Sequence, residues 1–128
     1  DKYIVEQNIK FEYLKEKKVE DYLKIDKQLN KYYDDFVLML NTIEKYFEFG
    51  FSKNSLPQVS RIYFEALSVG THLALTENPH FTTNREKVNK WLNSNEFKST
   101  ISGKYHTHIP QRINQRIMFV KNNLLKNG

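Results

Sequence analysis

The chain has 128 residues, with 20 Lys and Arg, 15 Asp and Glu, four His and no Cys, and its formal net charge is +5. This length suits one domain with a core of its own, and the 39% apolar content is typical of a folded rather than a disordered chain. The absence of Cys excludes disulfides and thiolate metal sites and favours a reducing, cytoplasmic compartment, and no apolar run approaches the ~18 residues that a membrane span needs.

The chain begins with Asp1 rather than Met. We therefore expect residues 1–128 to be a single helical domain and the C-terminal fragment of a longer protein. On this interpretation, the chemistry of the parent protein lies in the part that precedes Asp1.

The first 50 residues predict two helices. One covers residues 3–17, and the charged stretch at residues 15–18 marks a break before a long helix over residues 19–47, which contains neither Gly nor Pro. The apolar residues of the long helix recur with the spacing of a short coiled coil, and they are Tyr22, Leu29, Phe36 and Ile43, with Tyr33, Leu40 and Phe47 between them. This seam is expected to pack inside the fold, against another copy of the chain, or against a missing N-terminal domain.

A second long helix is predicted after residue 55. Ser55 and Gln58 have the spacing of a capping box, and the Asn78-Pro79 pair ends the helix. Apolar residues cover most of its circumference, so we expect it to be central and buried on several sides. Gly70 in its middle predicts a close crossing with another helix.

The rest of the chain predicts shorter helices. A capping box at Thr83 and Glu86 precedes a short helix that contains Trp91, a further turn follows around Phe97, and a polar loop covers residues 102–110. The final helix runs over residues 111–126 with an apolar stripe of Ile113, Ile117, Val120 and Leu124. Because no alternating pattern of a sheet occurs, the fold class is all-α, with four to five helices.

Catalytic and metal-binding patterns are weak in this sequence. His106 and His108 are two residues apart in a polar loop, but a metal site needs at least one further ligand. His72 is interpreted as a half-buried histidine of the central helix. No phosphate-binding loop, nucleophile elbow or thiol nucleophile is present. We therefore expect no catalytic site, metal or cofactor in this chain, and a metal-dependent hydrolase based on His106 and His108 is the alternative.

The net charge is unevenly distributed. Residues 1–50 contain 9 Lys and 11 acidic residues, a net of −2, and residues 51–128 contain 11 basic and 4 acidic residues, a net of +7. A basic half favours an acidic partner such as DNA. The candidate nucleic-acid contacts are Arg112, Arg116, Lys104, Lys121 and Arg61. The alternative is that Arg112 and Arg116 pair with Asp or Glu of the long first helix and so tie the two halves together.

Three segments resemble a known family. Residues 49–53 (FGFSK), 60–70 (SRIYFEALSVG) and 116–120 (RIMFV) look like the C-terminal helical region of GmrSD-type bacterial proteins, over roughly residues 10–126. The resemblance implies a protein of phage defence or modified-DNA restriction, in which a ParB-like domain with an Asp-Gly-Gln-Gln-Arg motif handles nucleoside triphosphate. That motif and a His-Asn-His nuclease module are both absent from this chain, and residues 106–110 only echo the nuclease pattern.

The sequence therefore leads to two functional hypotheses. The first is a non-catalytic helical accessory domain of a defence-type protein, which positions DNA or the catalytic domain of the parent protein. The alternative is a helical module for oligomerisation or protein interaction with no role in nucleic-acid binding. Its partners would be a missing N-terminal domain, a partner subunit or a second copy of the chain.

Overall fold

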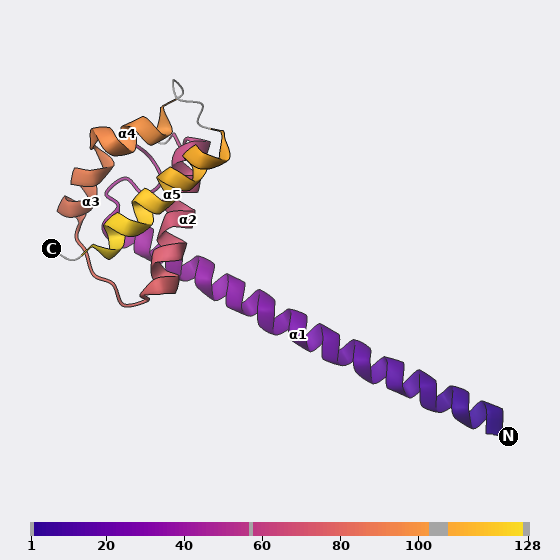
Figure 1. Cartoon of the computed structure of the whole chain (residues 1–128). Coiled ribbons are helices and arrows are strands. Elements are labelled where there is room, and N and C mark those ends of the chain that lie inside the picture. The colour runs from indigo at the N-terminus through magenta and orange to yellow at the C-terminus, as the bar shows by residue number, and fades with distance from the viewer. Residues whose placement is uncertain (1, 57, 103–107, 127–128) are drawn as a thin grey trace. The chain divides into compact units, whose positions relative to one another are not determined.

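Helices form all the regular secondary structure that the structure describes. The structure, a computed structural model, describes residues 2–56, 58–102 and 108–126. Within these ranges it contains no strand, and its helices are α1 (Lys2–Tyr46), α2 (Arg61–Glu77), α3 (Arg85–Leu92), α4 (Asn95–Ile101) and α5 (Pro110–Leu125) (Figure 1). The predicted all-α class with one long N-terminal helix is confirmed.

Helix α1 is continuous, so the predicted break at residues 15–18 is wrong. Lys and Glu have high helix propensity, and a charged stretch without Gly or Pro gives the backbone no reason to leave the helix. The chain divides by its internal contacts into two units, residues 1–35 and 36–128, which are described separately. In the first unit the described side chains are exposed, apart from the partly buried Asp35.

The second unit has a hydrophobic core to which every helix contributes. The last turns of α1 supply Met39, Ile43 and Tyr46, and Phe47 follows them. An aromatic cluster fills the centre, in which Trp91 meets Phe47, Phe97 and Phe119 edge-on, with ring centroids 5.9–6.2 Å apart. The C-terminal part of the predicted seam, Ile43 and Phe47, is thus confirmed as core.

Helices α2 and α5 (Figure 1) make the most extensive helix–helix contact of this unit. Gly70 of α2 lies close to Val120 and Ile117 of α5. A Cβ atom on Gly70 would lie 2.6 Å from the Cβ of Val120 and 2.9 Å from the carbonyl oxygen of Ile117. The predicted close crossing is therefore confirmed, and the absence of a side chain at Gly70 permits it. Helix α2 is buried on a narrower face than expected, because Phe64 and Val69 are 40% and 39% exposed.

The helix starts differ from the predicted ones. The side chain of Ser60, not Ser55, caps α2 by accepting a hydrogen bond from the backbone N–H of Tyr63. Likewise Asn84, not Thr83, caps α3, and its side chain accepts from the N–H of Lys87 at 2.8 Å. The end of α2 at Asn78 is as predicted.

Arg85 closes the C-terminal end of α1. Its Nε and one terminal nitrogen donate to the backbone carbonyls of Lys45 and Glu44, at 3.2 and 3.0 Å. The last carbonyls of a helix lack partners within it and carry negative partial charge, so a guanidinium stabilises them. The neighbouring Asn89 donates to the carboxylate of Glu48 at 2.9 Å. These contacts join α3 to the end of α1 within the second unit.

Candidate interaction surfaces

Arg116, one of the expected DNA contacts, is a buried structural residue. It is 2% exposed, and its guanidinium donates through Nε and a terminal nitrogen to Oε1 of Glu65, at 3.1 and 2.8 Å. A phosphate on the surface cannot reach a group so placed, so we remove Arg116 from the candidate DNA contacts. The expected pairing of Arg116 with an acid of the long first helix is wrong, because its carboxylate partner Glu65 belongs to α2 and lies in the same half of the chain.

Among the other expected DNA contacts that the structure describes, Arg61 is exposed and the other two are partly buried. Lys121 is partly buried, and its Nζ lies 3.7 Å from the carboxylate of Glu77 on α2. Arg112 is partly buried and donates to the side chain of Gln115 at 3.0 Å. Arg61 is exposed at the start of α2, and Lys104 lies outside the described residues. Helix α5 therefore directs two of its basic side chains, Arg116 and Lys121, to carboxylates of α2.

The histidines do not form a recognisable metal site in the described part of the chain. Within the described ranges no group of three His, Asp or Glu side chains could hold a metal ion. His108 is exposed, and its neighbour His106 lies outside the described residues. His72 is exposed, contrary to the expected half-buried position, because it lies on the outer side of α2. No described helix is long and apolar enough to cross a membrane.

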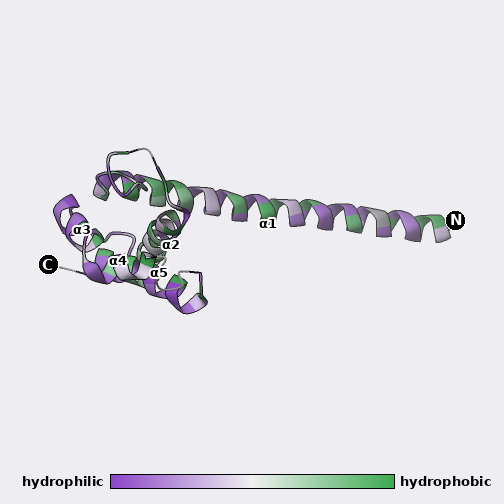
Figure 2. Ribbon diagram, turned by 90° about the horizontal axis from the view of Figure 1, so that it is seen from above, coloured by the Kyte–Doolittle hydropathy of each residue, from purple (hydrophilic) through white to green (hydrophobic). Residues whose placement is uncertain are grey.

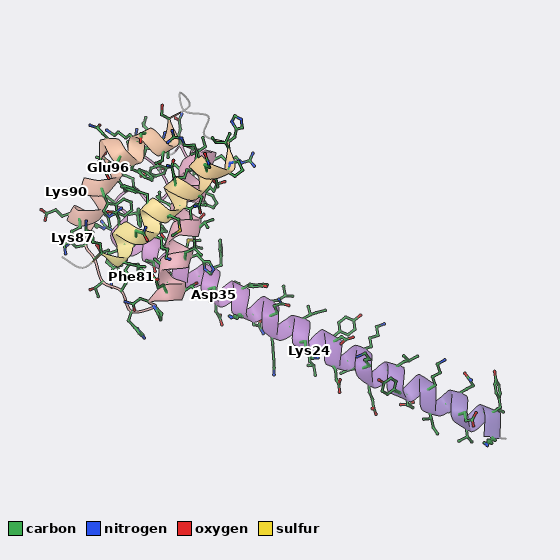
Figure 3. The ribbon with its side chains drawn as sticks, in the orientation of Figure 1. Lys24, Asp35, Phe81, Lys87, Lys90 and Glu96 are labelled. Atoms are coloured by element: carbon green, nitrogen blue, oxygen red, sulfur yellow. The ribbon has the colours of Figure 1, made fainter. Side chains whose placement is uncertain are left out.

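A cavity of about 330 Å³ is lined by α3, α4 and the end of α5. Lys87 and Lys90 extend from α3 and Glu96 from α4 (Figure 3), and Trp91 and Phe119 are also in the lining. The Nε1 atom of Trp91 is buried and has no hydrogen-bond partner in the described part of the chain. Lys126 also lines the cavity, so its charged lining residues are three lysines and one glutamate, and their net positive charge favours an anion. Sequence patterns gave no signal for this cavity.

Tyr63 is a buried phenol of α2, and burial raises its pKa from 10.0 to about 12. The folded state thus favours the protonated form, and this contribution to stability is present below pH 10 and lost as the pH rises towards 12. We expect the free energy of unfolding to fall by about 2 kcal/mol over this interval.

Urea unfolding at pH 9 and pH 12 would measure this loss. We expect Tyr63→Phe to be less sensitive to the change of pH, and Tyr33→Phe, which alters an exposed ring, to behave as the wild type. An equal loss in the wild type and in Tyr63→Phe would assign the effect to other groups.

The first unit carries an exposed apolar face. Its large exposed apolar residues are Tyr3, Ile4, Val5, Ile9, Tyr13, Leu14, Val19, Tyr22, Leu23, Ile25, Leu29, Tyr32 and Tyr33. Figure 2 shows the recurrence of apolar residues along α1. Tyr22, Ile25, Leu29 and Tyr32 follow the alternating three- and four-residue spacing of a coiled-coil core, and each is 51–58% exposed. We call these four residues the exposed seam.

The exposed seam differs from the expected one in its members. The expected seam contained Tyr22 and Leu29, but its intermediate positions were Tyr33, Leu40 and Phe47, four residues after each core residue, so Ile25 and Tyr32, three residues after, were missed. The alternating three- and four-residue spacing that starts at Tyr22 predicts Ile25 and Tyr32 as core positions. The same spacing continues in the sequence through Phe36 to Met39, Ile43 and Tyr46, and the last three are core residues of the second unit.

Local interactions give the first unit limited support. The side-chain amide of Gln28 donates to the hydroxyl oxygen of Tyr32 at 2.8 Å, and Nζ of Lys18 lies 5.8 Å from the centre of the Tyr22 ring. Such contacts contribute a few tenths of a kcal/mol each on a helix surface. Helices in proteins are stabilised mainly by packing of an apolar face, and the face of residues 2–35 is exposed.

Comparison with known proteins adds no family. No protein-family model matches the chain, and no curated protein or solved structure is significantly similar to it. The resemblance to GmrSD-type proteins remains a prediction.

Proposed function

We propose that this chain is a non-catalytic helical interaction module that binds a helix of another polypeptide through the exposed seam. One observation carries the proposal. Four large apolar side chains, Tyr22, Ile25, Leu29 and Tyr32, follow coiled-coil spacing on one helix and are all more than half exposed.

The energetics of burial support this role. Fully burying a large apolar side chain contributes roughly 1.5–3 kcal/mol, so a partner that covers these four residues gains several kcal/mol before the cost of association. The second unit already has a core of its own, which includes Met39 and Ile43 of α1. Knobs-into-holes packing by a second helix is the arrangement that this spacing favours.

The role in positioning DNA or a catalytic domain, which the similarity to defence proteins implies, remains a prediction. Arg116 and Lys121 have carboxylate partners on α2, so the structure offers fewer free cations for DNA than the sequence suggested. A covering helix could come from a catalytic domain of the same assembly, so the interaction module is compatible with that part of the expectation.

Site-specific photo-crosslinking in the native cells tests the proposal. A photo-reactive phenylalanine replaces Tyr32 on the exposed seam or, as the control, Leu23 on another side of the same helix, which is equally exposed (both 58%). We expect a discrete adduct from position 32, with the crosslinked peptide in an amphipathic helical segment of the partner, and none of comparable yield from position 23.

The matched variants Ile25→Lys/Leu29→Lys and Leu23→Lys/Asn30→Lys add the same charge at different rows of α1. The first pair should reduce the adduct at position 32 at least tenfold, since it places ammonium groups in an apolar interface. The second pair should leave the adduct in place. An adduct that survives Ile25→Lys/Leu29→Lys, or no adduct at position 32, would contradict the proposed function.

A further inference from the structure

Acidic side chains border the exposed seam. In the coiled-coil repeat, the residue before the first core position and the residue after the second core position flank the interface. For residues 21–35 these flanking positions are Asp21, Asp26, Gln28, Tyr33 and Asp35, so three of the five are acidic and none is basic. Within the described ranges none of the three aspartates forms an ion pair.

Within residues 21–35 the lysines Lys24, Lys27 and Lys31 all lie outside the flanking positions, and Lys18, one turn earlier, lies over the ring of Tyr22. Lys10, Lys17, Lys24 and Lys31 are each seven residues apart, at the third position of the repeat, which lies outside the interface. Lys24 is one of the side chains labelled on α1 in Figure 3. The flanking positions of the exposed seam therefore carry three negative charges and no positive charge.

This charge pattern disfavours a second copy of the chain as the partner. In a parallel pair, Asp21 of one helix would face Asp26 of the other. In an antiparallel pair, like flanking positions meet, so Asp26 would face Asp26, or Asp21 would face Asp35. Like charges placed opposite each other across an interface are destabilising and select against that pairing.

We infer that the partner is an amphipathic helix of a different polypeptide whose apolar seam is flanked by Lys or Arg. This inference rests on the proposed function and specifies the chemistry of the partner. Basic flanking residues would face Asp21, Asp26 and Asp35 across the interface, which accelerates association and sets the register of the two helices.

Two designed 21-residue peptides test the inference. They share Ile and Leu at the core positions and differ only at the flanking positions, which are all Lys in one peptide and all Glu in the other. We expect the full chain to bind the Lys peptide about tenfold more tightly than the Glu peptide in fluorescence anisotropy. The difference should shrink as the salt concentration rises.

Charge reversal on the chain gives the matched comparison. Asp21→Lys/Asp26→Lys/Asp35→Lys should invert the preference in favour of the Glu peptide. The control Glu6→Lys/Glu20→Lys/Asp34→Lys makes the same change in net charge at the outermost position of the repeat and should keep the preference for the Lys peptide. Circular dichroism of each variant verifies that helix content is retained.

The outcomes separate this inference from the proposed function. Equal affinity for the two peptides, binding of neither, or a preference that charge reversal does not invert would overturn the inference. Self-association of the chain that Ile25→Lys/Leu29→Lys abolishes would also overturn it, while it would support an interaction module. The proposed function is tested separately, by crosslinking at position 32, and that experiment uses no designed peptide.

Discussion

Replacement of Glu65 by alanine is expected to lower the free energy of unfolding by about 3 kcal/mol in urea titrations at neutral pH. The carboxylate of Glu65 accepts two hydrogen bonds from the guanidinium of Arg116, which is buried against α2. Removal of the acid leaves that charge buried without its carboxylate partner, and the cost of the buried charge exceeds the worth of an exposed pair.

Glu77→Ala is the matched control. Glu77 is largely exposed and lies 3.7 Å from Nζ of Lys121, so its loss should cost at most about 1 kcal/mol. The double variant Glu65→Leu/Arg116→Leu should recover part of the stability that Glu65→Ala loses, because no buried charge remains. If Glu65→Ala cost no more than Glu77→Ala, the pair of buried Arg116 and partly exposed Glu65 would not stabilise the second unit.

The same geometry affects how DNA-binding experiments are interpreted. Arg116→Ala removes a buried cation and leaves Glu65 without its partner, so a loss of DNA affinity in this variant would report on folding. Arg61→Ala changes an exposed residue and is the informative substitution.

Gly70→Ala is expected to lower the free energy of unfolding by about 2 kcal/mol, measured by thermal or urea denaturation. Helix propensity by itself predicts a gain of about 1 kcal/mol for this substitution in a helix interior. The added Cβ would lie within 3.0 Å of Val120 and of the carbonyl oxygen of Ile117, so α2 and α5 must move apart. The neighbouring substitution Val69→Ala, at a partly exposed site of α2, should cost less than about 1 kcal/mol. A stabilised Gly70→Ala would contradict the tight crossing.

The helices themselves could be predicted because helix formation is governed by local spacing and composition. The alternating apolar pattern predicts a helix, the Asn78-Pro79 pair predicts its end, and Gly70 predicts a close crossing. Each of these signals can be recognised within a few residues of the sequence. Exact starts were less predictable, because Ser55 and Ser60, or Thr83 and Asn84, satisfy similar capping rules. The structure selects the member of each pair that lies where the chain enters the helix.

The sequence by itself determined that the chain is helical, that α1 has a coiled-coil spacing, and that positive charge concentrates after residue 50. Only the tertiary structure decided which of these residues are available to a partner. Ile43 and Tyr22 belong to the same seam, yet one is buried in the core and the other exposed. Arg116 belongs to the basic half, yet it is bound to Glu65. Burial and pairing depend on contacts between residues far apart in the chain, which the spacing along one helix does not encode.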